Sequence, residues 1–141
     1  MTRTKFPKIS IDILIIKEGK ILLGLLTNKW SYKGKQVYGV PGRDIRFGET
    51  IGETVKRDIE EDLGCNVITY KTFCVNANYA ISNHYIGIGI LAEIDDEPKN
   101  LKSEDWEKWE WFDTNNIPGN LFPAAKNVIK SYLENRISVS E

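Results

Sequence analysis

Residues Pro41 to Cys65, PGRDIRFGETIGETVKRDIEEDLGC, decide the fold of this 141-residue chain. The stretch predicts a loop punctuated by glycines, then a helix, then a turn at Gly64. Thr50 and Glu53 have the spacing of a capping box, which satisfies two backbone N–H groups at the start of a helix. The predicted buried stripe recurs every fourth residue: Ile51, Val55, Ile59 and Leu63.

Three acidic residues lie beside this apolar stripe. Asp58, Glu61 and Asp62 are spaced i, i+3 and i+4, so their carboxylates are predicted to converge on one patch. Like charges held this close raise one another's pKa unless a cation joins them. Hard divalent ions such as Mg²⁺ prefer carboxylate oxygens and commonly bring waters and substrate phosphates. The patch therefore predicts a metal site, and the alternative interpretation is a helix that is acidic by chance.

The same stretch resembles the signature of the Nudix hydrolases of the MutT type, G-x5-E-x7-R-E-U-x-E-E-x-G-U, where U is a bulky aliphatic residue. The matching positions fall in register: Glu49, Arg57, Ile59, Glu61 and Gly64. Because many defined positions agree over one fixed spacing, this resemblance is far more specific than a lone short motif.

Four positions depart from the pattern. Asp58 and Asp62 stand where the signature has Glu. Each is one methylene shorter, which retracts the carboxylate by roughly 1.5 Å, and Mg²⁺ tolerates little distance error. Arg43 replaces a glycine, and Cys65 takes the last apolar position. Since the number of carboxylates is unchanged, we expect metal binding that is shifted or mediated by water, in an unaltered fold.

The resemblance implies an α/β fold, a Nudix-type α/β/α sandwich around a mixed β-sheet, with residues 1–141 as a single domain. It also implies hydrolysis of a nucleoside diphosphate linked to a further group, in which water attacks phosphorus and metal ions neutralise the phosphate charge. Mg²⁺ is the implied cofactor, with Mn²⁺ as the alternative ion, and relatives are often homodimers. Outer motifs resemble those of nucleoside triphosphate diphosphatases: His84-Tyr85, residues 97–100 and residues 109–111.

The resemblance also implies roles for single residues. The implied metal ligands are Asp58, Glu61, Asp62 and the carbonyl of Arg43. The implied catalytic residues are Glu61, Arg57 and Glu49. Arg57 is expected to orient Glu49 or Glu61 through a charge-assisted hydrogen bond. The sequence does not identify the general base. Glu104 and Asp105 are loop candidates, but their simpler interpretation is solvated surface charge.

Substrate contacts are predicted at His84, Arg43 and Tyr38. His84 is the only histidine, and a histidine side chain could contact phosphate; a hydrogen-bonded strand-end histidine is an equal alternative. Arg43 and Arg46 could hold a distal phosphate, or both could be solvent-facing loop charges. Three aromatic rings near the motif could stack on a base, with hydrophobic packing as the alternative: Trp30, Tyr32 and Tyr38.

Composition narrows the class of protein. The chain is 41% hydrophobic and 28% charged, which is ordinary for a soluble globular protein. Its net charge of −1 gives no field that would attract nucleic acid or an anionic membrane. Cys65 and Cys74 have no metal-binding spacing and form no disulfide framework, so a reduced, cytoplasmic setting is expected. The apolar run near the start is short and broken by Asp12, so it predicts neither a signal peptide nor a membrane span.

The rest of the chain is dominated by strands. Strands are predicted over residues 8–17, 21–27, 36–40, 66–80, 84–94 and 109–112. An amphipathic closing helix is predicted over residues 122–133. With the acidic helix, these elements predict an α/β sandwich around a mixed sheet.

Three functions compete on the sequence alone. The leading one is a Mg²⁺-dependent diphosphatase that converts a (d)NTP or a modified nucleotide to the monophosphate and diphosphate. The second is a nucleotide-sugar hydrolase, and the third is a nucleotide-binding module with little turnover, which the Arg43 replacement and the shortened acids motivate. Because all three acidic positions keep a charge, the enzyme is favoured.

Overall fold

The computed structural model describes residues 6–80, 83–134 and 138–140. Its strands are β1 (Lys8–Lys17), β2 (Lys20–Leu26), β3 (Tyr38–Gly39), β4 (Val67–Ala80), β5 (Asn83–Ile94), β6 (Trp106–Asp113) and β7 (Ser138–Ser140). Its helices are α1 (Ile51–Leu63), α2 (Pro123–Leu133) and the 3-10 helix η1 (Asn28–Trp30). The predicted strands and both predicted helices are confirmed, although β3 is shorter than predicted and β7 was not predicted.

The strands form one mixed sheet in the order β3-β2-β1-β5-β4-β7, and β6 pairs with β2 along its whole length. β1 runs parallel to β5, and β4 runs parallel to β7. The other pairings are antiparallel, including the β1–β2 hairpin across Glu18 and Gly19. The long β4–β5 pair and the parallel β1–β5 pair place side chains from three strands next to one another.

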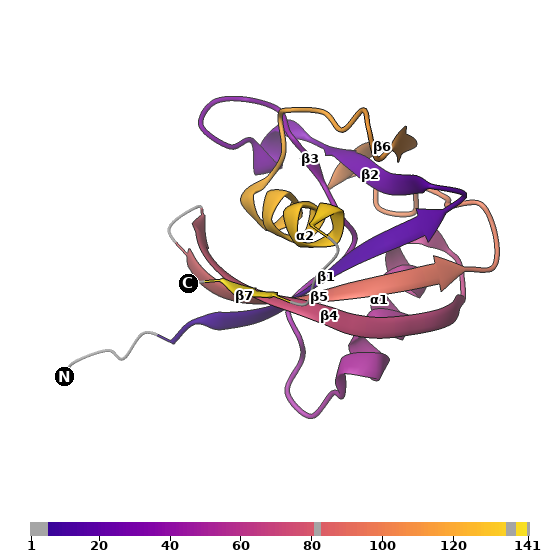
Figure 1. Cartoon of the computed structure of the whole chain (residues 1–141), viewed down its shortest axis with the longest axis horizontal. Coiled ribbons are helices and arrows are strands. Elements are labelled where there is room, and N and C mark those ends of the chain that lie inside the picture. The colour runs from indigo at the N-terminus through magenta and orange to yellow at the C-terminus, as the bar shows by residue number, and fades with distance from the viewer. Residues whose placement is uncertain (1–5, 81–82, 135–137, 141) are drawn as a thin grey trace.

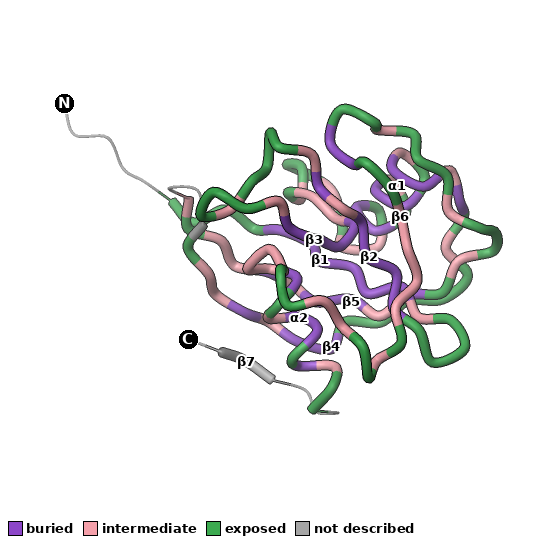
Figure 2. Tube along the Cα trace, turned by 90° about the horizontal axis from the view of Figure 1, so that it is seen from above, coloured by how far each residue is buried: buried purple, intermediate pink, exposed green. Residues whose placement is uncertain are grey.

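The two long helices cover opposite faces of the sheet (Figure 1). On β1, Ile11, Ile13 and Ile15 pack with the apolar stripe of α1. Leu14 points the other way and packs with Val128 of α2. Figure 2 shows that buried positions gather in these central elements, while the connecting loops are exposed. The α/β/α sandwich predicted from the sequence is therefore confirmed.

The loop that precedes α1 is bound to β1 along its first half. The Ile13 N–H donates to the Pro41 carbonyl at 2.9 Å, and the Ile11 N–H donates to the Arg43 carbonyl at 3.0 Å. Gly42 has a φ of +133°, and a Cβ at this position would collide with the Ile11 carbonyl oxygen. Only glycine fits this close approach of two backbones. The pairing fixes where the loop delivers Arg43 and the residues after it.

Candidate active site

Helix α1 begins and ends as the sequence predicts. The Thr50 side chain accepts a hydrogen bond from the Glu53 N–H, and the Glu53 side chain accepts one from the Thr50 N–H, which completes the capping box. Gly64 ends the helix in the left-handed conformation with a φ of 65°. Val55, Ile59 and Leu63 are fully buried. Because these apolar residues pack against the sheet, the acidic residues between them are held in fixed positions.

Arg57 ties the helix to the loop before it. Its Nε donates to Glu49 Oε2 at 2.8 Å and its Nη2 donates to Glu49 Oε1 at 2.9 Å, so the hydrogen bonds expected from the sequence are present. The Arg57 guanidinium lowers the pKa of Glu49 to about 2, and a hydroxyl hydrogen bond from Thr54 adds to this. Arg57 also donates to the Asp44 carbonyl. A charged pair of this bidentate kind fixes position as well as charge.

The three acids of the helix differ in environment. The side chains of Asp58 and Asp62 are 0% and 1% exposed, whereas that of Glu61 is 38% exposed. Burial raises the pKa of Asp58 to about 6, against the lowering effect of Arg57, and burial also raises the pKa of Asp62. Glu61 is thus the acid most open to solvent.

Cationic side chains lie beside every one of these acids. Arg57 Nη1 is 3.2 Å from Asp58 Oδ1 and 4.0 Å from Glu61 Oε2. Lys102 Nζ is 3.5 Å from Glu61 Oε2 and 3.6 Å from Asp62 Oδ1. The repulsion predicted between the carboxylates is therefore relieved by protein cations, one of which, Lys102, comes from outside the motif.

The donor chemistry of this site fits a hard divalent cation. Asp58 Oδ1 and both carboxylate oxygens of Asp62 are buried and accept no hydrogen bond from the described residues. Buried oxygens in this state favour a cationic ligand. In the described part of the chain, however, no three His, Cys, Asp or Glu side chains gather closely enough to form a ready-made metal cluster. The site therefore matches a divalent cation in the type and the burial of its oxygen atoms. Protein cations, however, lie between the carboxylates.

Asp105 was interpreted from the sequence as solvated surface charge, and this was wrong. The residue is 7% exposed. Its carboxylate accepts hydrogen bonds from Trp30 Nε1 at 2.9 Å, Lys29 Nζ at 3.2 Å and Arg43 Nη2 at 3.2 Å. Burial would raise the pKa of Asp105, but these donors outweigh it and lower the pKa. Glu104, the residue before Asp105, is exposed as expected.

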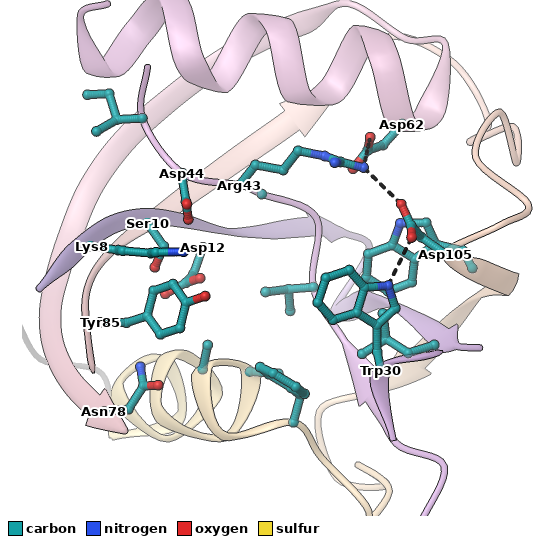
Figure 3. A pocket seen from close by; sticks show the side chains of 18 of the residues that line it. Lys8, Ser10, Asp12, Trp30, Arg43, Asp44, Asp62, Asn78, Tyr85 and Asp105 are labelled. Atoms are coloured by element: carbon teal, nitrogen blue, oxygen red, sulfur yellow. Dashed lines mark hydrogen bonds and ion pairs between the residues drawn. The ribbon is translucent and has the colours of Figure 1, made fainter. Parts of the chain in front are cut away.

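A pocket of about 500 Å³ opens beside the acidic helix. Figure 3 shows Arg43, Asp62, Asp105 and Trp30 at one end of it. The other end holds a separate polar group, formed by side chains from β1, β4 and β5: Ser10, Asp12, Asn78 and Tyr85. The pocket therefore joins a charged end next to α1 to a second end that is rich in hydrogen-bonding groups.

Asn78 and Tyr85 are placed at the second end by strand pairing. They are direct partners in the β4–β5 ladder. Neither the nitrogen nor the oxygen of the Asn78 amide has a hydrogen-bond partner among the described residues, although both atoms are buried. A buried amide without partners in a pocket is suited to a ligand that offers both a donor and an acceptor.

Of the three predicted substrate contacts, only Arg43 lines the pocket. Trp30, among the aromatic candidates, lines it as well. His84 is exposed and is not part of the pocket lining; its neighbour Tyr85 lines the pocket instead, because successive strand residues face opposite sides. Tyr38 packs edge-on against Phe112 in the core below α2, outside the pocket lining.

The polar residues at the second end were not identified from the sequence as site residues. Asp12 was noted only as an interruption of an apolar run. It is 8% exposed and accepts a hydrogen bond from the Ser10 hydroxyl. An acid in the middle of an otherwise buried strand was the signal that could have identified this end of the pocket.

Asp12 should make the stability of the protein depend on pH. Burial raises its pKa to about 7 from 3.8, so the folded protein binds more protons than the unfolded chain between these values. The contribution of Asp12 to the free energy of unfolding is fully present below pH 3.8 and is lost as the pH rises to about 7. We expect Asp12→Asn to be more stable than wild type by about 2–4 kcal/mol at pH 8 and equal to it near pH 4.

Urea denaturation at pH 4, 6 and 8 measures this difference. Asp113→Asn, a change at an exposed acid at the end of β6, is the control and should show no such trend. A constant difference between Asp12→Asn and wild type across this pH range would contradict the expectation.

Comparison with known proteins places the chain in a family. The ADP-ribose pyrophosphatase of Methanocaldococcus jannaschii is 31% identical over 128 residues, which cover 90% of this chain and 73% of that protein. The solved structure of a MutT Nudix hydrolase from Burkholderia pseudomallei superposes with a TM-score of 0.80 at 23% identity, covering 90% of this chain and 98% of that one. The chain belongs to the Nudix hydrolase family.

This Nudix hydrolase is accordingly an enzyme that acts on diphosphate bonds, as the sequence analysis expected. Members of the family generally need a divalent metal ion. The Nudix domain of Shewanella oneidensis NrtR, solved in complex with ADP ribose, has a TM-score of 0.73 at 16% identity and covers 94% of this chain and 90% of that one. No family model matches the sequence. Within the described residues, the helices are too short or too polar to cross a membrane.

Proposed function

We propose that this Nudix hydrolase is a Mg²⁺-dependent diphosphatase of nucleoside diphosphate derivatives, with a (d)NTP or a modified nucleotide as the foremost substrate and Mn²⁺ as the alternative ion. The observation that carries the proposal is the continuous pocket. Its charged end suits a polyphosphate, and its second end offers hydrogen-bonding groups for a base. The pocket thus matches the two chemical halves of a nucleotide.

The proposed metal ligands are Asp58, Glu61 and Asp62. When bound there, a divalent ion would neutralise phosphate charge and lower the pKa of a bound water. Glu61 is the most exposed of the three acids, and Asp62 is the one that lines the pocket. Arg57 and Glu49 act as positioning residues, because their paired hydrogen bonds hold the loop against the helix. The Arg43 carbonyl is a further proposed ligand, although it already accepts the Ile11 N–H.

The basic residues around the acids have a proposed role toward the phosphates. Arg46 and Lys102 are 61% and 23% exposed at their side chains and lie next to Glu61. Both can donate hydrogen bonds to phosphate oxygens that enter the charged end. His84 is retained only as a proposed outer contact, and Tyr38 as a proposed contact that would require a ligand to reach beyond the pocket.

ADP-ribose is the second candidate substrate. It is named in the activity of the Methanocaldococcus jannaschii relative and in the complex of the NrtR Nudix domain. Like a nucleoside triphosphate, it joins a base to a diphosphate, so the same pocket could bind either. A nucleotide-sugar and binding without turnover remain the further alternatives.

A substrate panel tests the proposal. Purified protein with Mg²⁺ is given nucleoside triphosphates, oxidised nucleotides, ADP-ribose and a nucleotide-sugar, and the products are separated by ion-exchange chromatography. We expect a monophosphate plus diphosphate from the preferred triphosphate, and no turnover once the metal is chelated. Release of ribose phosphate from ADP-ribose at the highest kcat/KM would select the second candidate. Binding without any product would contradict an enzymatic role.

The setting of the reaction is also proposed. We infer one Nudix domain over residues 1–141, a small-molecule substrate in place of nucleic acid or membrane, and a cytoplasmic location. The near-neutral net charge of −1 supports the inference about partners. Homodimer formation stays a prediction.

A further inference from the structure

The guanidinium of Arg43 lies between two buried carboxylates of the charged end. Its Nη2 is 3.5 Å from Asp62 Oδ1 and 3.2 Å from Asp105 Oδ2. Figure 3 shows the side chain reaching across from its loop to both acids. The Asp62 and Asp105 side chains are 1% and 10% exposed. Buried carboxylates need compensating cations. Arg43 is the one shared by both acids, beside Lys102 Nζ at 3.6 Å from Asp62 Oδ1 and Lys29 Nζ at 3.2 Å from Asp105 Oδ1.

The starting point of this side chain is fixed. The Arg43 N–H donates to Asp58 Oδ2 at 3.0 Å, and its carbonyl accepts the Ile11 N–H at 3.0 Å. Its Nε is buried and has no hydrogen-bond partner in the described part of the chain. The backbone is therefore anchored on both sides, while the guanidinium is held by one hydrogen bond to Asp105 and by the charge of Asp62.

The two acids hold Arg43 differently. Asp105 accepts a hydrogen bond from Arg43, whereas Asp62 lies at 3.5 Å and accepts no hydrogen bond from the described residues. Asp62 is thus the acid whose oxygens stay available to another cation. An ion bound to those oxygens would lie within a few ångströms of the guanidinium and would be repelled by it. Asp105 offers Arg43 a partner that does not depend on Asp62.

We propose that Arg43 is a built-in counter-cation that competes with the divalent ion for Asp62 and so weakens metal binding at this site. The inference rests on the proposed function only in placing a divalent ion at the acidic helix. Glycine, which the family signature has at this position, carries no charge that could compete. With arginine at this position, the protein itself compensates part of the negative charge of the carboxylates.

The test is Mn²⁺ binding to the substrate-free protein. Free Mn²⁺ is measured by electron paramagnetic resonance, and heats are measured by titration calorimetry, for wild type, Arg43→Gln and Arg43→Lys. We expect Arg43→Gln to bind Mn²⁺ about tenfold more tightly or better, because the like charge is gone. Arg43→Lys, which keeps the charge, should stay near wild type. The matched control is Arg46→Gln, an exposed arginine of the same loop 3.9 Å from Glu61, whose effect solvent should screen.

Two results would overturn the proposal. One is equal or weaker Mn²⁺ affinity in Arg43→Gln, including no binding to either protein. The other is equal tightening in Arg43→Lys, since the charge would then not be the cause. Thermal melting confirms that each variant is folded. If Arg43→Gln does not fold, Arg43→Met is used in its place. A wild-type protein that hydrolyses nothing in the substrate panel would contradict the proposed function and leave this measurement unaffected.

Discussion

Glu61→Gln is expected to lower kcat on the preferred substrate by a factor on the order of 10²–10⁴. The change removes one charge from the most exposed of the three proposed metal ligands while keeping the length of the side chain. Glu61 is 38% exposed, and its nearest cation, Lys102, lies at 3.5 Å. Because such exposed pairs contribute little, we expect the free energy of unfolding to change by less than about 1 kcal/mol.

The matched control is Glu60→Gln, the adjacent residue on the same helix. Glu60 is exposed, and removing its charge should leave kcat and KM close to wild type. Steady-state kinetics with saturating Mg²⁺, together with urea denaturation of all three proteins, separates catalysis from folding. Undiminished hydrolysis by Glu61→Gln would remove Glu61 from the mechanism.

Arg57→Met should destabilise the protein by about 3 kcal/mol at pH 7, because it leaves a buried carboxylate without its cation. The side chain of Asp58 is 0% exposed, and Arg57 Nη1 lies 3.2 Å from it. The same change removes both hydrogen bonds from Arg57 to Glu49, which leaves Glu49 only the helix hydrogen bond from the Thr54 hydroxyl. We also expect kcat to fall, since the loop and the acids are then no longer held together.

Urea denaturation with a shared m-value measures the loss for Arg57→Met. Lys56→Met, at an exposed position on the preceding residue of α1, is the control and should stay within about 0.5 kcal/mol of wild type. Arg57→Lys should recover only part of the stability, because one ammonium cannot reproduce the paired bonds from Nε and Nη2 to Glu49. A loss below about 1 kcal/mol in Arg57→Met would show that these contacts contribute little.

The parts of this molecule that the sequence predicts well are local. The capping box at Thr50, the stripe through Val55 and Ile59, and the left-handed turn at Gly64 each depend on residues within a few positions of one another. The bonds between Arg57 and Glu49 follow from the family spacing in the same way. Local chemistry therefore gave both the helix and its acidic face.

The rest of the pocket depends on contacts between distant parts of the chain. Ser10 meets Gly87 across β1 and β5, and Asn78 meets Tyr85 across β4 and β5, so the second end exists only once the strands are in register. Asp105 becomes buried because Trp30 and Arg43 close over it from other segments. No periodicity or short motif carries this information.

A further consequence follows from the attachment of the loop before α1 to β1. Since the Ile11 and Ile13 amides are bonded to this loop, it behaves as an additional half-strand of the central sheet. It cannot swing out as a lid without breaking bonds to β1, whose central residues 10–15 are buried. Adaptation to ligands of different shape must then come from the opposite walls, where Trp30 and Phe122 border the cavity. Over evolutionary time the preferred substrate can change there while the phosphate-facing half stays rigid.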